Sequence, residues 1–222
     1  MSPAVTARMT AEATASFPPA SDPLGRVRSA LSVDLPEGSS DFDLNPQVVL
    51  PEGRRLREAA VLIALLHRPA GLEVILTKRS SHLAHHPGQI AFPGGKIDPG
   101  DADAPSAALR EAEEEIGLPP ASVAILGHLP VHETVTGYRV HPIVGEVRAP
   151  FIARPEPGEV EEVFTVPLSR LADPRLYRIE KRRWRNEFRS YYVIPYGPYY
   201  IWGATARMLM ALARRMEVGD GR

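Results

Sequence analysis

The stretch of sequence that decides the fold runs from Gly94 to Leu118 and reads GGKIDPGDADAPSAALREAEEEIGL. Two glycines open it, and an acid-rich loop follows in which Asp101 or Asp103 can cap a helix. Pro105 suits the first helical turn, whereas Gly117 marks the end of the apolar periodicity and two further prolines prevent its continuation. The stretch therefore predicts a glycine loop that leads directly into a helix.

The predicted helix carries two distinct faces. At about 100° per residue, one arc is apolar and should pack against a sheet, while a second arc of roughly 100° holds three carboxylates. The apolar arc consists of Ala108, Leu109, Ala112 and Ile116, and the acidic arc consists of Glu111, Glu114 and Glu115. Carboxylates this close raise one another's pKa, and a hard divalent cation such as Mg²⁺ keeps them ionised. Arg110, at the edge of the acidic arc, can hold one of them in a fixed pose through its planar guanidinium.

A solvated acidic helix face is the alternative explanation, because most charge runs in proteins are surface features. Glu113 lies off the acidic arc and fits that explanation. The preceding loop favours a site, since Gly94 and Gly95 allow the backbone to approach a ligand closely, and the Gly94 carbonyl could complete the shell of an ion. We therefore expect a catalytic metal site whose ligands are Glu111, Glu114, Glu115 and Gly94, with Arg110 beside them.

The segment from Gly95 to Leu118 resembles the Nudix box, whose second half is Arg-Glu-U-x-Glu-Glu-x-Gly-U with U apolar. Residues 110–118 match that half in full. The first half is one residue longer than the usual box, and aspartates stand near the place of its early glutamate, namely Asp98, Asp101 and Asp103. The resemblance implies an α/β (α+β) Nudix fold, a mixed β-sheet sandwiched between helices, with Mg²⁺ or Mn²⁺ as cofactor. It also implies hydrolysis of a nucleoside diphosphate linked to another group.

The sequence before the box is similar to the signature of the coenzyme A diphosphatase branch of that family. The signature is Leu-Leu-Thr-x-Arg-Ser/Ala, three residues, Arg, three residues, Gly, three residues and Phe-Pro-Gly-Gly. Residues 75–80, Gly88 and residues 92–95 match it with the same spacing, and residues 201–206 also resemble this branch. The resemblance covers residues 58 to about 212, and it implies cleavage of coenzyme A to adenosine 3′,5′-bisphosphate and 4′-phosphopantetheine.

One position departs from the signature, because Ala84 stands where the second arginine is expected. Lys78, His85 or His86 could supply the missing positive charge. The departure keeps a rival open, a Nudix enzyme that acts on ADP-ribose, a dinucleoside polyphosphate or an oxidised nucleotide. A non-catalytic Nudix-fold nucleotide sensor is a further rival, which the intact acidic helix disfavours.

The candidate contacts to the substrate follow from the same signature. Arg79 is placed to meet a phosphate bidentately. The full set of candidates is Thr77, Lys78, Arg79, Gln89, Phe92 and Gly95, of which Phe92 is equally well explained as a core residue. A basic run between Arg178 and Arg189 could hold the 3′-phosphate, although a solvated face is the favoured explanation. The general base is left open between Glu111, Glu159 and Glu162, and Glu162 is included among the catalytic candidates.

Composition limits the other possibilities. Lys plus Arg total 26 and Asp plus Glu total 27, so the net charge of −1 disfavours a nucleic-acid partner. The chain has no cysteine, which excludes disulfides, zinc-thiolate sites and a cysteine nucleophile. No segment approaches the roughly 20 apolar residues of a membrane helix. We expect a cytoplasmic protein without a membrane partner, a monomer or homodimer that binds a small nucleotide substrate of the coenzyme A class.

The chain divides into residues 1–55, a flexible N-terminal arm with a possible short helix at residues 26–33, and residues 56–218, a hydrolase domain. Apolar runs and turn residues predict a hairpin of two strands, further strands, and a closing amphipathic helix. The predicted strands are residues 59–66, 72–77, 123–133, 138–147, 163–166, 190–195 and 199–202, and the closing helix is residues 204–216. Mixed strands with a helix in mid-chain and one at the end indicate a layered domain.

Overall fold

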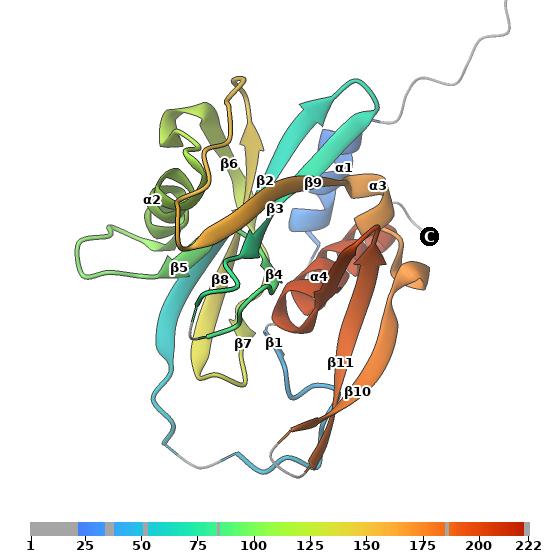
Figure 1. The fold of residues 1–222 in the computed structure, drawn as a ribbon. Coiled ribbons are helices and arrows are strands. Elements are labelled where there is room, and N and C mark those ends of the chain that lie inside the picture. The colour runs from blue at the N-terminus through green and yellow to red at the C-terminus, as the bar shows by residue number, and fades with distance from the viewer. Residues whose placement is uncertain (1–21, 34–37, 51–52, 84, 185–186, 220–222) are drawn as a thin grey trace, which may run out of the picture.

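A mixed β-sheet lies between helices in the computed structural model, which describes residues 22–33, 38–50, 53–83, 85–184 and 187–219 (Figure 1). Helix α2 (Ala104–Ile116) covers one face of the sheet. Helices α1 (Pro23–Leu31), α3 (Leu168–Leu171) and α4 (Gly203–Gly219) cover the other. This arrangement confirms the predicted fold class.

The sheet is organised around strand β2 (Arg57–Arg68), which is buried along most of its length. It pairs antiparallel with β3 (Gly71–Arg79), as the predicted hairpin requires, and parallel with β8 (Tyr138–Val147). The described strands follow the order β1-β7-β8-β2-β3-β4, while β5, β6 and β9 pair with β2, β8 and β3. The remaining bounds are β1 Ser39–Ser40, β4 Ile90–Ala91, β5 Gly94–Lys96, β6 Val123–His128, β7 His132–Glu133 and β9 Val160–Pro167.

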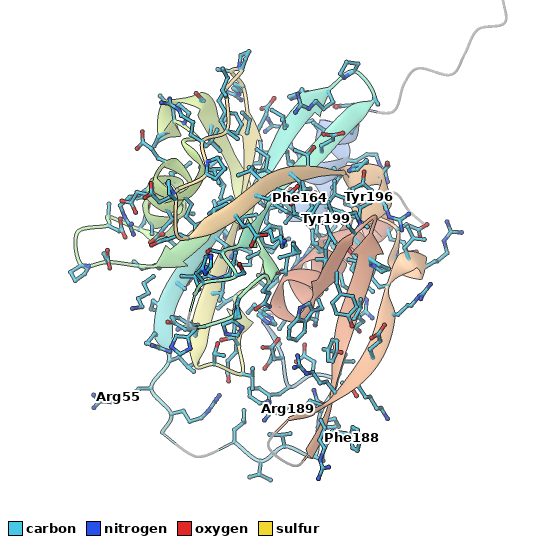
Figure 2. All side chains as sticks on the ribbon, in the orientation of Figure 1. Arg55, Phe164, Phe188, Arg189, Tyr196 and Tyr199 are labelled. Atoms are coloured by element: carbon cyan, nitrogen blue, oxygen red, sulfur yellow. The ribbon has the colours of Figure 1, made fainter. Side chains whose placement is uncertain are left out.

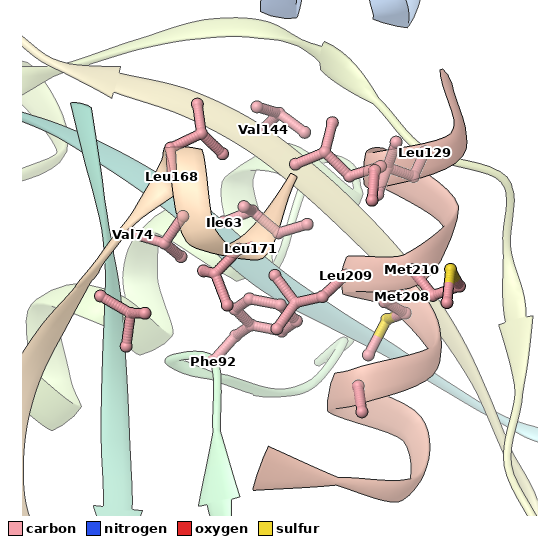
Figure 3. Close-up of a cluster of buried hydrophobic side chains, with 14 of the residues drawn as sticks. Ile63, Val74, Phe92, Leu129, Val144, Leu168, Leu171, Met208, Leu209 and Met210 are labelled. Atoms are coloured by element: carbon pink, nitrogen blue, oxygen red, sulfur yellow. The ribbon is translucent and has the colours of Figure 1, made fainter. Parts of the chain in front are cut away.

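Two apolar cores hold the layers together. Leu62, Ile75 and Ile116 are fully buried between the sheet and α2, where the predicted apolar arc of the helix packs. The other core lies between the sheet and α4, and Figure 3 shows Leu209 of that helix facing Phe92 and Leu171. Burial of side chains of this size contributes about 2 kcal/mol each, so the two cores fix where α2 and α4 sit on the sheet.

A second sheet of three strands packs beside α4 and extends away from the main sheet (Figure 1). Its strands are β10 (Arg178–Trp184), β11 (Glu187–Tyr196) and β12 (Tyr199–Trp202). The hairpin of β11 and β12 confirms the prediction for residues 190–202. The described residues of the basic run between Arg178 and Arg189 belong to β10 and β11, which pair as antiparallel strands.

Three details differ from the sequence-based expectations. Gly94 and Gly95 were expected to form a loop, but they belong to β5, which pairs with Ala59–Val61 of β2. The single strand expected over residues 123–133 is divided into β6 and β7, because Pro130 has no N–H to donate to a ladder. Asp101 does not cap α2, since Asp103 accepts the hydrogen bond from the Ser106 amide.

The N-terminal part of the chain also packs against the domain where it is described. Helix α1 matches the short helix expected at residues 26–33, and its Val27 and Ala30 are fully buried. Residues 1–21 of the expected arm lie outside the described residues, and the division at residue 55 stays a prediction. Within the described ranges, no helix is long and apolar enough to cross a membrane.

Candidate active site

The glycine loop brings the backbone of β5 against β2 and towards α2. Gly94 adopts φ +151°, and a Cβ at this position would lie 2.4 Å from the Ala60 carbonyl oxygen. Only glycine fits both the backbone conformation and this close approach. The Gly94 amide then donates a hydrogen bond of 3.1 Å to the Glu115 carboxylate near the end of α2. The loop and the helix therefore form one unit, which we call the acidic site: Gly94, Gly95, Arg110, Glu111, Glu114 and Glu115.

Glu115 is the buried carboxylate of this site, with 5% of its surface exposed. Burial raises its pKa to about 7, because the charged form loses its hydration. The Gly94 hydrogen bond and the nearby Arg79 charge oppose that rise, whereas the charges of Glu111 and Glu159 add to it. The cost of ionising Glu115 identifies it as a group that a cation would stabilise.

Glu111 lies one helical turn before Glu115 and faces the glycine loop. A Cβ added to Gly95 would come within 2.6 to 2.7 Å of the Glu111 carboxylate atoms, so the bare glycine leaves room for that carboxylate. Burial raises the pKa of Glu111, and the Arg110 guanidinium opposes the rise. The carboxylates of Glu111 and Glu115 therefore both lie next to the glycine loop, one near Gly95 and the other at the Gly94 amide.

Arg110 holds the acidic site together with a set of directed contacts. Its Nε and Nη2 donate to the Asp101 carboxylate at 2.9 and 3.0 Å, the bidentate geometry that a guanidinium favours. This pairing lowers the pKa of Asp101. Its Nη1 lies 3.1 Å from Glu111 and 2.9 Å from Glu114, so one cationic nitrogen bridges two carboxylates of the acidic arc. Asp101 thus has an anchoring role rather than the capping role considered for it.

The residues of the acidic site have the chemical character that suits a hard divalent cation. Carboxylate and carbonyl oxygens are the ligands that Mg²⁺ and Mn²⁺ prefer, and two of these carboxylates already share one cationic nitrogen. Glu115 in particular carries a charge that its buried position disfavours. Among the described residues, no three His, Asp or Glu side chains converge as a closed metal-binding group. The ligand set of Glu111, Glu114, Glu115 and Gly94 accordingly stays a prediction.

The expected substrate contacts fall into different environments. Arg79 ends β3, and its charge acts on Glu115, so it lies beside the acidic site. Thr77 is buried and donates its hydroxyl to the Ala91 carbonyl at 3.2 Å, and Phe92 is 3% exposed in the α4 core. The side chains of Thr77 and Phe92 thus support the loop from within. Lys78 forms an ion pair of 2.6 Å with Glu161.

Two glutamates of β9 and the loop before it were considered as bases. Glu159 is exposed, and its charge raises the pKa of Glu115, so it lies near the acidic site. Glu162 accepts a hydrogen bond from the Tyr199 hydroxyl, and the Tyr199 ring stacks on Phe164 with centroids 3.6 Å apart. Figure 2 shows these two rings together where β9 meets the second sheet. A catalytic role for Glu162 stays a prediction.

A cavity of about 790 Å³ opens between the main sheet and the second sheet. We call it the aromatic cavity, because its wall includes Tyr191, Tyr192, Tyr199, Tyr200 and Trp202. It also includes Lys78 and Gln89, so it begins one residue along β3 from Arg79. The glutamates of α2 do not line it. The acidic site and the larger aromatic cavity are therefore neighbours near the end of β3.

The segment Ser39–Asn45, which we call the arm segment, supplies a wall of this cavity. His132 of β7 is fully buried and contacts both Ser39 and Asp41 at 2.9 and 3.1 Å. Asn45 exchanges two hydrogen bonds with the backbone of Ser190 in β11, at 2.9 and 2.7 Å. The sequence analysis did not find these residues. The density of aromatic residues between 188 and 202 was a visible sign of a binding surface, but no local pattern distinguishes Asn45.

The chain belongs to the Nudix family, because the NUDIX domain model matches residues 56–188. The fold and the acidic helix agree with that membership, and the protein is a Nudix hydrolase family member. It is similar to "Uncharacterized Nudix hydrolase NudL" of Escherichia coli strain K12, with 40% identity over 188 residues, which cover 84% of this chain and 97% of that protein. The NudL of Shigella boydii serotype 18 is 39% identical over 188 residues, with the same coverage.

Among solved structures, the chain is similar to the MutT protein from Methanosarcina mazei Go1. The two share 18% identity with a TM-score of 0.49, and the match covers 78% of this chain and 100% of that one.

Proposed function

We propose that this protein hydrolyses the diphosphate bond of coenzyme A, or of a coenzyme A derivative, with Mg²⁺ or Mn²⁺ as cofactor. The products are adenosine 3′,5′-bisphosphate and 4′-phosphopantetheine. The observation that supports the proposal is the proximity of two sequence motifs in the fold. Arg79, from the segment that resembles the coenzyme A diphosphatase signature, is close enough to Glu115 of the acidic helix for its positive charge to oppose the rise in the pKa of that carboxyl group.

The shape of the region supports the same substrate class. A diphosphate bound at the acidic site would lie next to Arg79, and the rest of a large substrate needs a separate space. The aromatic cavity of about 790 Å³ begins at the neighbouring residues Lys78 and Gln89. Cavities of this size accommodate drug-sized ligands, so a substrate with two sizeable halves fits better than a simple nucleotide.

Each residue of the acidic site has a distinct task in this proposal. Glu111, Glu114 and Glu115, with the Gly94 carbonyl, would hold the cation, which neutralises phosphate charge and makes water more acidic. Arg110 keeps Glu111 and Glu114 in place through its contacts of 3.1 and 2.9 Å. Arg79 binds a phosphate oxygen, and Glu111 orients the attacking water. Water adds to one phosphorus, the bridging oxygen leaves with the other phosphate, and Glu159 or Glu162 accepts the proton.

The test is product analysis with purified full-length protein. Coenzyme A, ADP-ribose and a dinucleoside polyphosphate are each incubated with Mg²⁺ or Mn²⁺, with a chelator, and with a Glu115→Gln variant. Metal-dependent release of adenosine 3′,5′-bisphosphate from coenzyme A is expected, with a loss of at least about 10³-fold in kcat for the variant. If ADP-ribose or the dinucleoside polyphosphate is cleaved faster than coenzyme A, that compound takes the place of coenzyme A as the proposed substrate.

The second candidate is a Nudix hydrolase for one of those other nucleoside diphosphate derivatives, and Ala84 at the signature arginine is the observation that favours it. Residue 84 lies outside the described residues. A nucleotide sensor without catalysis is the remaining alternative, and tight binding of one nucleotide without turnover would identify it. We retain a cytoplasmic location and a monomer or homodimer as predictions.

A further inference from the structure

The turn that leads into β4 places the side chain of Gln89 in the wall of the aromatic cavity. Pro87 and Gly88 are the two central residues of this turn, and Gly88 adopts φ +68°. The Gln89 amide donates a hydrogen bond of 3.2 Å to the His86 carbonyl, which closes the turn. Proline followed by a glycine with positive φ is the pattern of a type II turn, in which both central residues have restricted backbones. The turn therefore holds Gln89 in a defined position.

The carboxamide of Gln89 is available to a ligand. The residue is partly buried and lines the cavity, and its carboxamide has no hydrogen-bond partner among the described residues. A carboxamide offers an acceptor oxygen and a donor nitrogen in a single plane. In ligand cavities with mainly apolar walls, a small number of such polar groups fixes the orientation of the ligand. The Gln89 side chain therefore suits a ligand that presents a donor and an acceptor side by side.

An indole ring lies next to this carboxamide. The Gln89 Nε2 atom is 3.9 Å from the position that a Cβ on Gly203 would take, and Trp202 is the preceding residue. The start of α4 is tied to β4, because the Thr205 hydroxyl donates to the Ile90 carbonyl at 3.0 Å (Figure 1). The Trp202 ring also lines the cavity and meets a neighbouring tyrosine ring edge to face, with centroids 5.2 Å apart. A flat ligand at this place can contact an aromatic ring and reach the carboxamide together.

Gln89 is also a neighbour of the residue that we propose binds the diphosphate. The Arg79 amide donates to the Gln89 carbonyl at 3.0 Å, so the two residues lie side by side where β3 ends. The charge of Arg79 acts on Glu115 of the acidic site, whereas Gln89 lines the cavity. In a nucleotide, one ribose separates the 5′-phosphate from the base. A diphosphate bound at Arg79 would therefore bring the base of the same nucleotide to the cavity wall.

We infer that this part of the aromatic cavity binds adenine and that Gln89 is the residue that recognises it. The inference rests on the proposed function only in that the substrate contains adenosine linked to a diphosphate. The Gln89 oxygen accepts from the 6-amino group, its nitrogen donates to N7, and the Trp202 indole packs against the purine. A glutamine carboxamide matches this edge of adenine, whereas hypoxanthine and guanine present two acceptors, O6 and N7. A base of that kind leaves one atom of the carboxamide without a partner, which is how such a site rejects it.

The test is calorimetric binding to the metal-free full-length protein, in chelator and without turnover. The probes are adenosine diphosphate and inosine diphosphate, which share ribose and diphosphate and differ in the base. Wild-type protein should bind adenosine diphosphate about tenfold more tightly, as expected for one lost hydrogen bond and one polar atom left without a partner. Gln89→Leu should bring the two affinities together. Gln47→Leu changes the chain's other glutamine, at an exposed position, and should leave the preference unchanged.

Three results would overturn the inference: equal affinities in wild-type protein, no measurable binding of adenosine diphosphate, or a preference that persists in Gln89→Leu. Because both probes are measured on the same protein, a partly unfolded variant does not alter the ratio of the two affinities. Trp202→Leu is a second variant, and it should weaken both probes by a similar factor, because stacking does not require a particular base.

Steady-state kinetics separate this inference from the proposed function. Coenzyme A and ADP-ribose both contain adenine, so Gln89→Leu should raise KM about tenfold for whichever of them is cleaved and leave kcat nearly unchanged. If neither compound is cleaved, the proposed function fails, and the binding preference between the two nucleoside diphosphates still decides the role of Gln89.

Discussion

The acidic site comes from one continuous stretch, residues 94–115, whereas the aromatic cavity is lined by residues spread from Ser40 to Arg207. The two regions meet at the end of β3, where the charge of Arg79 acts on Glu115 and Lys78 lines the cavity. The first region is formed by helix α2 and by the short glycine strand β5 that precedes it in the chain. The second region exists only after the arm segment, the signature loop and the second sheet have come together.

This difference in construction corresponds to a difference in expected function. In the proposed function the acidic site acts on the diphosphate, so changes there should lower kcat. The cavity is proposed to recognise the rest of the substrate, so changes there should raise KM or alter stability. The following variants test this division, beginning with the largest expected effect.

Ionisation of Glu115 should cost stability in the metal-free protein. Its pKa is about 7 in the folded state and 4.5 ordinarily, a difference that corresponds to about 3 kcal/mol of unfolding free energy. Below pH 4.5 both states are protonated and nothing is lost; as pH rises through 7 the folded state loses the full amount. Compared with Glu115→Gln, wild-type protein in chelator should therefore become about 3 kcal/mol less stable between pH 4.5 and 8.

The measurement is urea unfolding of both proteins across that pH range, with the variant as reference because it cannot ionise at this position. Addition of Mg²⁺ at pH 8 should stabilise wild-type protein and have little effect on Glu115→Gln. A constant difference between the two proteins at all pH values would show that Glu115 does not experience the buried environment described here.

Gly95→Ala should damage the acidic site by displacing a single carboxylate. The added Cβ would lie 2.6 to 2.7 Å from the Glu111 carboxylate atoms, so that carboxylate must move. A misplacement of about 1 Å at a catalytic group lowers kcat about 100-fold. The matched control is Gly100→Ala in the same loop, where no atom lies within 4 Å of the added Cβ. Full kcat in Gly95→Ala would mean that the Glu111 position is not important for the reaction.

Asn45→Ala should affect the other region. It removes a buried side chain that makes hydrogen bonds of 2.9 and 2.7 Å to Ser190 and one of 3.0 Å to the Asp41 carbonyl. The loss should be about 2 kcal/mol of unfolding free energy, together with a raised KM and a nearly unchanged kcat. Urea unfolding and steady-state kinetics measure both, with the exposed Gln47→Ala as control. A fall in kcat without a change in KM would contradict the division between the two regions.

Arg110→Lys should have the smallest effect of these variants. Lysine keeps the positive charge, but it cannot reproduce the paired contacts of 2.9 and 3.0 Å to Asp101 while it also reaches Glu111 and Glu114. Supporting contacts of this kind are worth about tenfold in activity, so kcat should fall by about that factor. Arg214→Lys on the exposed side of α4 serves as the control. If Arg110→Lys were as active as wild type, the guanidinium geometry would have no part in placing the carboxylates.

Much of the fold was predictable because its elements have clear local patterns. The apolar run of β2, the hairpin to β3 and the bounds of β8 follow from residue type and turn residues. Strand β5 was not predictable, since two glycines usually mark a break, and their pairing with Ala59–Val61 depends on the close approach of two backbones. The separation of β6 from β7, in contrast, falls at Pro130, a signal that is present in the sequence.

The candidate site divides in the same way. The acidic arc, Arg110 and Arg79 were predicted as site residues from spacing and from the family resemblance. The supporting positions of Thr77 and Phe92 are results of packing, because both side chains point into the domain. Asp101 was considered as a helix cap and as one of the aspartates near the place of the early glutamate of the box, and its pairing with Arg110 nine residues later required the folded loop.

The sequence by itself determined that α2 carries Glu111, Glu114 and Glu115 on one arc behind a glycine loop, since a helix repeats its faces every few residues whatever surrounds it. Only the tertiary structure decided that Glu115 is buried, that Asn45 reaches Ser190 across 145 residues, and that two opposed arginines face an aromatic cavity. Burial and contacts between distant segments arise when whole layers pack, and no local pattern of residues encodes them.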